Sequence, residues 1–217
     1  SVPAQKNLHK EIIKQKIENQ AALLESSGKL EEAKYLYSMA KKVRSGDTDN
    51  MESIAAQTYF PALFGDGFQR RQDNFINAAL NYGYAVVRSA IARTLVCYGF
   101  LPALGLFHCS EQNPFNLADD IIEPYRSFVD EWVISHFHKV VEADLTREQK
   151  AQLVNVLHQD IVLTGHSQGS ACTVLAAIEA TVISLSQSIV SSQKAVLNLP
   201  DLRASLQRRY RQEDEDE

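Results

Sequence analysis

Two carboxylates and a histidine lie close together in the middle of this sequence. Asp120 and Glu123 are three residues apart in a stretch of helical character, so both carboxylates project from one side of a helix. His108 precedes that helix, and residues 113–116 (NPFN) form a loop that could fold the imidazole back over the acids. Two carboxylates and one imidazole suit Mg²⁺ or Mn²⁺. Such an ion polarises a phosphate oxygen and stabilises the negative charge of the transition state.

Spacing alone does not separate this metal site from ordinary surface acids beside a loop histidine, because such clusters are common. A further acid, Glu52, precedes His108 by 56 residues, so spacing does not place it. It falls in the first turn of a helix expected from about residue 50, after a run of N-cap residues at 47–50. The helix dipole favours a carboxylate at that position.

Helices must position these side chains. Apolar residues recur at helical spacing along most of the chain, with lysines on the other faces of the first helix. The segment after residue 50 is expected to end at Pro61 and Gly65, and residues 100–115 form a connector. The other helices are predicted at residues 4–25, 29–44, 71–98, 117–137 with an interruption near Pro124, 146–158, 170–192 and 201–210.

The predicted fold is a mainly α-helical single domain over residues 1–212, with at most a short β element near 161–164. The composition favours helices, since there are only 9 Gly and 6 Pro. The net charge of −5 comes from residues 213–217 (EDEDE), which predict a disordered tail; the other 22 acids balance 22 bases. Charge therefore neither supports nor excludes nucleic acid as a partner.

Cysteine content and hydropathy bear on the cell compartment. Cys97, Cys109 and Cys172 are widely spaced and form no metal-type pair, which predicts a reduced, cytoplasmic protein. The sequence contains no signal-peptide pattern and no apolar run long enough for a bilayer.

A second motif points to different chemistry. Residues 165–169 (GHSQG) match the G-x-S-x-G nucleophile elbow of α/β hydrolases, between a strand-like run and a helix. No histidine follows His166, and the preceding chain is mainly helical, so a plain turn is the preferred interpretation. His136 and His138 are two residues apart, which points them to different faces of a helix and disfavours a metal role.

Several long stretches resemble the integrase/endonuclease of CRISPR spacer acquisition, the core protein of the adaptation complex, in its type II form. Several long matching stretches in the same order are far more specific than a short motif. The resemblance is detailed over roughly residues 5–135. The matching stretches are LHKEIIKQKIENQAALLE (8–25), SGDTDNMESIAAQTYFPALFG (45–65), RRQDNFINAALNYGYAVVRSAIAR (70–93) and GFLPALGLFHCSEQNPFNLADDIIEPYRSFVD (99–130).

The resemblance assigns roles to individual residues. It places the metal ligands for Mg²⁺ or Mn²⁺ on Glu52, His108 and Glu123, with Asp120 as a further active-site acid that serves as helper rather than direct ligand. Members join a DNA 3′ hydroxyl to the CRISPR repeat by direct transesterification. Replacing any of the three ligands by alanine is expected to abolish joining and leave the fold intact. The resemblance also gives weak support to DNA contacts by three residues, Arg70, Asn81 and Arg126.

The resemblance further implies partners and a location. Expected partners are double-stranded DNA, both prespacer and CRISPR repeat, and the small partner protein of the adaptation complex. The expected assembly is a homodimer, or a tetramer in the full complex, in a prokaryotic cytoplasm without a membrane partner. The small β-rich domain that precedes the helical one in the family is expected to be absent. The alternative functions are a non-catalytic DNA-holding or scaffolding subunit and, third, a serine hydrolase at GHSQG.

Overall fold

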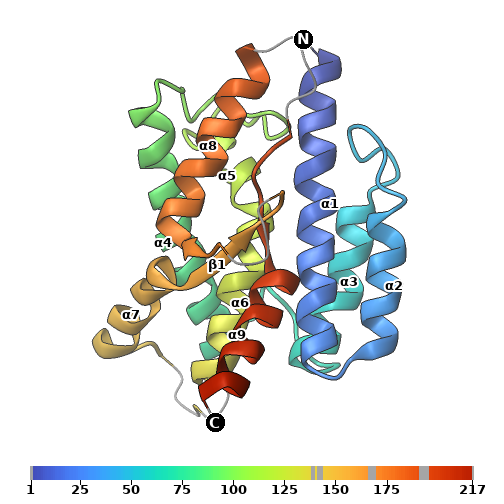
Figure 1. The fold of residues 1–217 in the computed structure, drawn as a ribbon, viewed down its shortest axis with the longest axis vertical. Helices are drawn as coiled ribbons and strands as arrows, with labels where there is room; N and C mark the ends of the chain where they lie inside the picture. Colours follow the sequence, from blue (N-terminus) through green and yellow to red (C-terminus); the bar gives the residue numbers. More distant parts are fainter. Residues whose placement is uncertain (1, 138–139, 141–143, 166–169, 191–195, 217) are drawn as a thin grey trace.

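The computed structural model describes residues 2–137, 140, 144–165, 170–190 and 196–216, and is helical over most of its length (Figure 1). This architecture confirms the predicted fold class. The elements in chain order are α1 (Val2–Ser26), α2 (Leu30–Ala40), α3 (Met51–Phe64), α4 (Phe75–Cys97), α5 (Asn116–Ile121), η1 (Glu123–Tyr125), α6 (Arg126–Phe137), α7 (Arg147–Val154), η2 (Asn155–His158), β1 (Asp160–Leu163), β2 (Cys172–Thr173), α8 (Val174–Val190), β3 (Pro200–Asp201) and α9 (Leu202–Asp216).

Helix α1 is the central element of the fold. It packs against α2 and α3 on one side and against α6, α9 and η1 on the other, as Figure 1 shows. Its buried apolar side chains include Ile12, Ile13, Ile17, Ala21 and Leu24. Because segments from distant parts of the chain meet on α1, a polar residue on its core face faces several of them at once.

Helices α4 and α6 approach each other closely at Gly83. A Cβ at that position would lie 2.5 Å from Val129 Cγ1, a distance that real side chains do not tolerate. The glycine therefore lets α6 pack closely against α4.

The β structure is small and antiparallel. Strand β1 pairs with β2, with Ile161 opposite Cys172, and with β3, with Val162 opposite Asp201. The predicted element near residues 161–164 is confirmed, and two short partner strands complete it. The sheet contacts α8 and α9.

Two helix ends differ from the sequence-based expectation. Pro61 lies inside α3, which runs to Phe64, so of the two residues expected to end this helix only Gly65 does so. A proline in the last turn removes only one helical hydrogen bond, and Gly65, with a φ of 104°, ends the helix instead. Helix α9 extends to Asp216, so the acidic run predicted to be disordered is helical up to that residue. The strong helix propensities of Arg, Gln and Glu account for the extension.

Candidate metal centre

Glu52 is positioned by a cap on α3 that comes from outside the helix. The two carboxylate oxygens of Asp47 accept hydrogen bonds from the backbone N–H groups of Met51, at 2.9 Å, and Glu52, at 3.0 Å. Asn50, the residue directly before the helix, makes no side-chain cap. The Asp47 carboxylate thus provides acceptors for two backbone N–H groups of the first turn and fixes the start of the helix. With the helix start fixed, Glu52 is directed toward α1.

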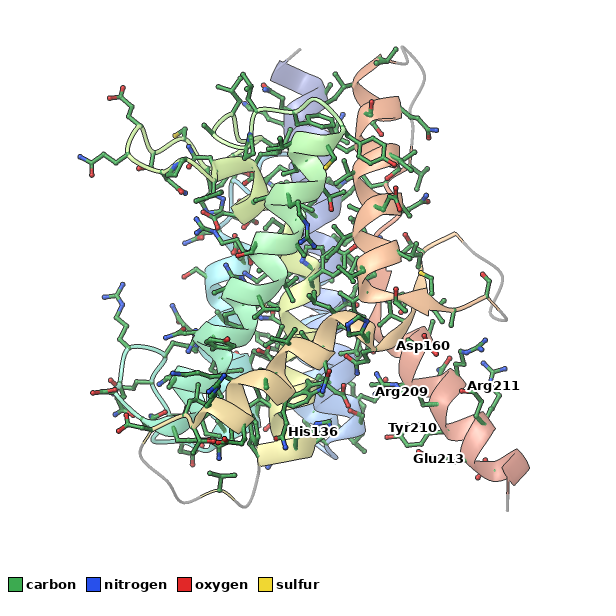
Figure 2. The ribbon with its side chains drawn as sticks, turned by 90° about the vertical axis from the view of Figure 1, so that its left-hand side faces the viewer. His136, Asp160, Arg209, Tyr210, Arg211 and Glu213 are labelled. Carbon is green, nitrogen blue, oxygen red and sulfur yellow. The ribbon has the colours of Figure 1, made fainter. Side chains whose placement is uncertain are left out.

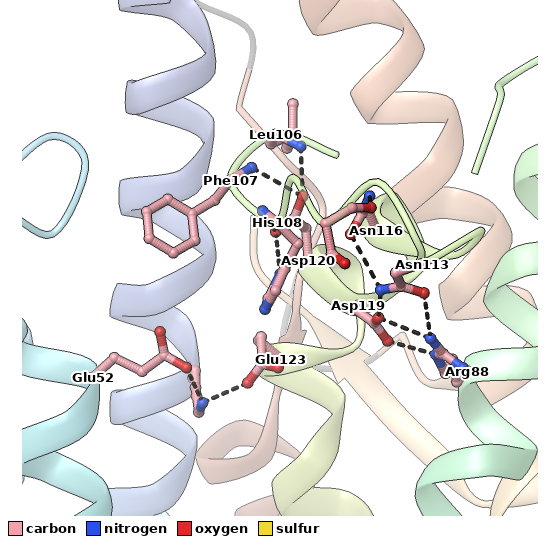
Figure 3. A network of polar contacts seen from close by, with 12 residues as sticks. Glu52, Arg88, Leu106, Phe107, His108, Asn113, Asn116, Asp119, Asp120 and Glu123 are labelled. Carbon is pink, nitrogen blue, oxygen red and sulfur yellow. Dashed lines mark hydrogen bonds and ion pairs between the residues drawn. The ribbon is translucent and has the colours of Figure 1, made fainter. Parts of the chain in front are cut away.

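Lys16 of α1 joins Glu52 to Glu123. Its Nζ lies 2.5 Å from Glu52 Oε1 and 2.5 Å from Glu123 Oε2, and the two dashed lines that meet between these acids in Figure 3 mark this contact. The Lys16 side chain is only 10% exposed. The expectation that lysines occupy only the outer faces of this helix was wrong for Lys16, since a buried ammonium is tolerated where carboxylates from other segments surround it.

Glu123 is held ionised in a buried position. Burial alone would raise the pKa of its carboxyl, but the charges of Lys16 and Arg126 lower that pKa to about 2. Arg126 Nε donates to Glu123 Oε1 at 2.9 Å. Oε2 is buried and makes a charge contact with Lys16 but no regular hydrogen bond. The acid therefore presents one oxygen that only a cation contacts.

The connector at residues 100–115 wraps around Asp120. The carboxylate accepts hydrogen bonds from the backbone N–H groups of Leu106, Phe107 and His108 and contacts Nδ1 of the His108 ring at 2.7 Å (Figure 3). A Cβ at position 105 would lie 2.2 Å from the His108 carbonyl oxygen, so glycine is required there. The loop thus folds His108 back over the acids, as expected from its sequence.

Asp120 fixes the tautomer of His108. A carboxylate can only accept, so Nδ1 carries the proton, and Nε2 is the ring nitrogen that this contact leaves over for another partner. The hydrogen bond to Asp120 raises the pKa of His108, and the charge of Glu123 adds to this effect. Four donors occupy the oxygens of Asp120, so this acid contacts the rest of the site through His108.

A second set of contacts fastens the connector to α4 and α5. Arg88 binds both oxygens of Asp119, at 2.5 and 2.8 Å, and Asn113 donates to Asp119 at 2.6 Å (Figure 3). Asn116 donates to the carbonyl oxygens of Ala103, at 3.0 Å, and Ser110, at 2.8 Å. Through these contacts, Asp119 and the two asparagines of the NPFN stretch hold the connector that carries His108 in place.

His9 is a site residue that the sequence did not reveal. Its buried ring stacks on Phe107 with centroids 4.1 Å apart, and its Nδ1 has no hydrogen-bond partner in the described part of the chain. His9 precedes Lys16 by seven residues, so both lie on the same face of α1. The seven-residue spacing of His9 and Lys16 was the signal in the sequence that could have identified His9.

The three weakly supported DNA contacts gather around one buried ring. The guanidinium groups of Arg70 and Arg126 lie 5.4 and 4.7 Å from the centroid of the Tyr84 ring, and Arg70 donates to Asn81 at 2.8 Å. Tyr84 itself is buried and donates to Asp130, so it does not offer a face to a nucleotide. Arg126, which binds Glu123, and Arg70, which binds the exposed Asn81, lie against the same Tyr84 ring. These contacts connect Glu123 to the surface at Asn81.

Asp130 makes the stability of this region dependent on pH. Burial raises the pKa of Asp130 to about 6, against the lowering effect of hydrogen bonds from Tyr84 and Tyr59. An unfolded aspartate has a pKa of about 3.9. From about pH 4 to pH 6 the folded protein therefore keeps a proton that the unfolded chain has lost, and the free energy of unfolding falls as pH rises.

We expect urea unfolding to show this decline, with a slope of up to about 1.4 kcal/mol per pH unit from this group. Asp130→Asn should flatten the slope over the same window. An equal decline in the variant would contradict the assignment.

The residues fit a divalent cation, although they are not arranged around one. Among the residues that the structure describes, no three His, Cys, Asp or Glu side chains converge as a metal cluster. Instead, Lys16 bridges Glu52 and Glu123, while the His108 ring is held beside them by Asp120 (Figure 3). Two ionised carboxylates, a buried oxygen contacted only by a cation, and an imidazole with a fixed tautomer are the donor set that such an ion requires.

The competing motifs gain no support. His166 and Ser167 of GHSQG and His138 lie outside the described residues, but the flanking strands β1 and β2 pair antiparallel, unlike the strand–turn–helix of a nucleophile elbow. His136 stacks on Trp132 with centroids 3.8 Å apart, which is a structural role. Figure 2 labels His136, which lies in the last turn of α6. All three cysteines are free. In the described part of the chain, no helix has the length and apolar character to cross a bilayer.

Comparison with known proteins identifies the family of this chain. The family model described as CRISPR associated protein Cas1 matches residues 3–163, which include every residue of the centre. The chain belongs to the Cas1 family. This finding confirms the resemblance seen in the sequence.

One relative in the Cas1 family is the CRISPR-associated endonuclease Cas1 of Neisseria meningitidis serogroup C (strain 8013). It is 46% identical over 203 residues, which are 93% of this chain and 66% of that protein, so the chain spans just under two thirds of that relative. A casposase bound to integration product covers 92% of this chain and 67% of its own, with a TM-score of 0.70 and 20% identity. A partial Cas6-RT-Cas1–Cas2 complex covers 92% and 69%, with a TM-score of 0.72 and 19% identity. At these identities the two structures support the fold alone.

Proposed function

We propose that this Cas1-family chain is the catalytic domain of a metal-dependent DNA integrase and endonuclease of CRISPR spacer acquisition. It would join the 3′ hydroxyl of a prespacer to the CRISPR repeat by transesterification. The observation that carries the proposal is the meeting of Glu52 and Glu123 on one cation, beside a histidine whose Nε2 is left free by Asp120. The 46% identical relative named an endonuclease supports the same class of chemistry.

Glu52, His108 and Glu123 would hold Mg²⁺ or Mn²⁺, which when bound neutralises charge on the reacting phosphate. The protein's own contribution is preorganisation. Arg126 keeps one oxygen of Glu123 turned away, so that the other faces the site. Asp120 holds the imidazole in one tautomer and one orientation.

The proposed substrates are the prespacer and the repeat, both double-stranded DNA. Arg70, Asn81 and Arg126 would contact the backbone, since guanidinium groups suit phosphate oxygens. The proposed partner is the small protein of the adaptation complex, in an assembly of Cas1-type dimers. The fold similarity to a Cas1–Cas2 complex is in line with that assembly.

The test is half-site integration of a labelled prespacer by the full-length protein together with its small partner. We expect joined product with Mg²⁺ or Mn²⁺ and none with a chelator. The DNA-holding alternative predicts DNA binding without joining and without Mn²⁺ at the site. A crystal soaked in Mn²⁺ distinguishes the two, since the proposal requires the ion on Glu52, His108 and Glu123.

A further inference from the structure

Lys16 is the one residue of the centre that supplies positive charge to both carboxylates. Its Nζ lies 2.5 Å from an oxygen of Glu52 and 2.5 Å from an oxygen of Glu123. The side chain comes from the middle of α1 and is almost fully buried between Glu52 and Glu123, which lie 36 and 107 residues later in the chain. A lone ammonium in such a place would be strongly destabilising, so its position depends on the two acids.

The acids depend on Lys16 in turn. Two carboxylates that share a buried space repel each other, and a positive charge between them removes that repulsion. Glu123 has a second positive neighbour, Arg126, but that guanidinium binds Oε1 and not the oxygen that Lys16 contacts. Lys16 is therefore the charge that holds the two acids toward each other.

A divalent cation would need the same oxygen of Glu123. Oε1 is engaged by Arg126, which leaves Oε2, the atom that Lys16 contacts and that lacks a regular hydrogen bond. An ammonium and a metal ion cannot both be in contact with one buried oxygen without strong mutual repulsion. Binding of a metal ion to this oxygen must therefore move the Lys16 ammonium away from it.

We propose that Lys16 is a built-in counter-ion that keeps Glu52 and Glu123 together before metal binds and competes with the metal for them. This inference rests on the proposed metal site. The residue is a positioning residue: it preorganises two ligands and sets how tightly the ion binds. Replacing Lys16 by a neutral residue separates the two effects. The metal-free protein loses stability, while the two acids gain affinity for a divalent cation.

The experiment measures Mn²⁺ binding by calorimetry and thermal unfolding with and without Mn²⁺, on the full-length protein. We expect Lys16→Gln to lower the unfolding temperature of the metal-free protein, to bind Mn²⁺ about tenfold more tightly or better, and to gain more stability from Mn²⁺ than the wild type does. Lys16→Arg keeps the charge and should stay close to the wild-type affinity.

Lys14→Gln is the matched control. Lys14 lies on the same helix, is exposed, and pairs with Glu18 at 3.7 Å. Its replacement should change neither Mn²⁺ affinity nor the metal-free unfolding temperature.

The outcomes distinguish the inference from the metal site on which it rests. If wild type binds Mn²⁺, Glu52→Gln loses it and Lys16→Gln binds no more tightly, the metal site stands and the competitor role is overturned. If neither wild type nor Lys16→Gln binds Mn²⁺, or if Glu52→Gln binds it normally, both ideas fail. Should Lys16→Gln fail to fold alone, circular dichroism during a Mn²⁺ titration provides the readout, since the proposal requires Mn²⁺ to restore the helical signal.

Discussion

Replacing His108 by alanine should reduce metal-dependent strand joining on the order of a hundredfold or more, while the protein stays folded. The ring supplies the nitrogen donor of the proposed centre, and without it two carboxylates remain to hold the ion. The side chain is 43% exposed, so its removal costs little packing. Asp120 keeps its three backbone donors, and the loop stays in place.

The measurement is the rate of half-site integration in the complete complex, resolved on a denaturing gel, with thermal unfolding as the test of folding. His158→Ala is the control, because His158 is an exposed histidine remote from the site in η2. Normal integration by the His108→Ala protein would exclude this residue from the metal centre.

Replacing Glu123 by alanine should destabilise the protein by about 3–5 kcal/mol. This differs from the expectation that each ligand could be removed with the fold intact. Glu123 is buried between Lys16 and Arg126, with a side chain only 6% exposed, and its loss leaves Arg126 without the carboxylate that it binds. Joining should be lost as well, so this variant tests stability better than it tests catalysis.

Urea unfolding gives the free energy directly, and Glu111→Ala, at an exposed position, is the control. Adding Arg126→Met to Glu123→Ala should recover part of the loss, because it removes the charge left without its carboxylate, whereas Lys16 keeps Glu52 as a partner. A loss below about 1 kcal/mol for Glu123→Ala would show that solvent screens this cluster, contrary to its burial.

Much of the fold and of the site could be predicted from local patterns. Helical periodicity located every long helix, and the break at Pro124 appears as η1 between α5 and α6. The spacing of Asp120 and Glu123 and the loop after His108 predicted a compact site, because all three lie within 16 residues of one another. Helix ends were less certain, as Pro61 and the acidic run show, since the ends depend on single capping and packing contacts.

The sequence by itself determined the helical class and the family, and it predicted the acidic–histidine set with Asp120 in a supporting role. Only the tertiary structure decided that Glu52 meets Glu123, and that Lys16 lies between them. Periodicity assigns a lysine to solvent because burying an ammonium alone is unfavourable. That penalty is removed only when carboxylates from distant segments arrive at the same point, and their arrival is a property of how the helices pack.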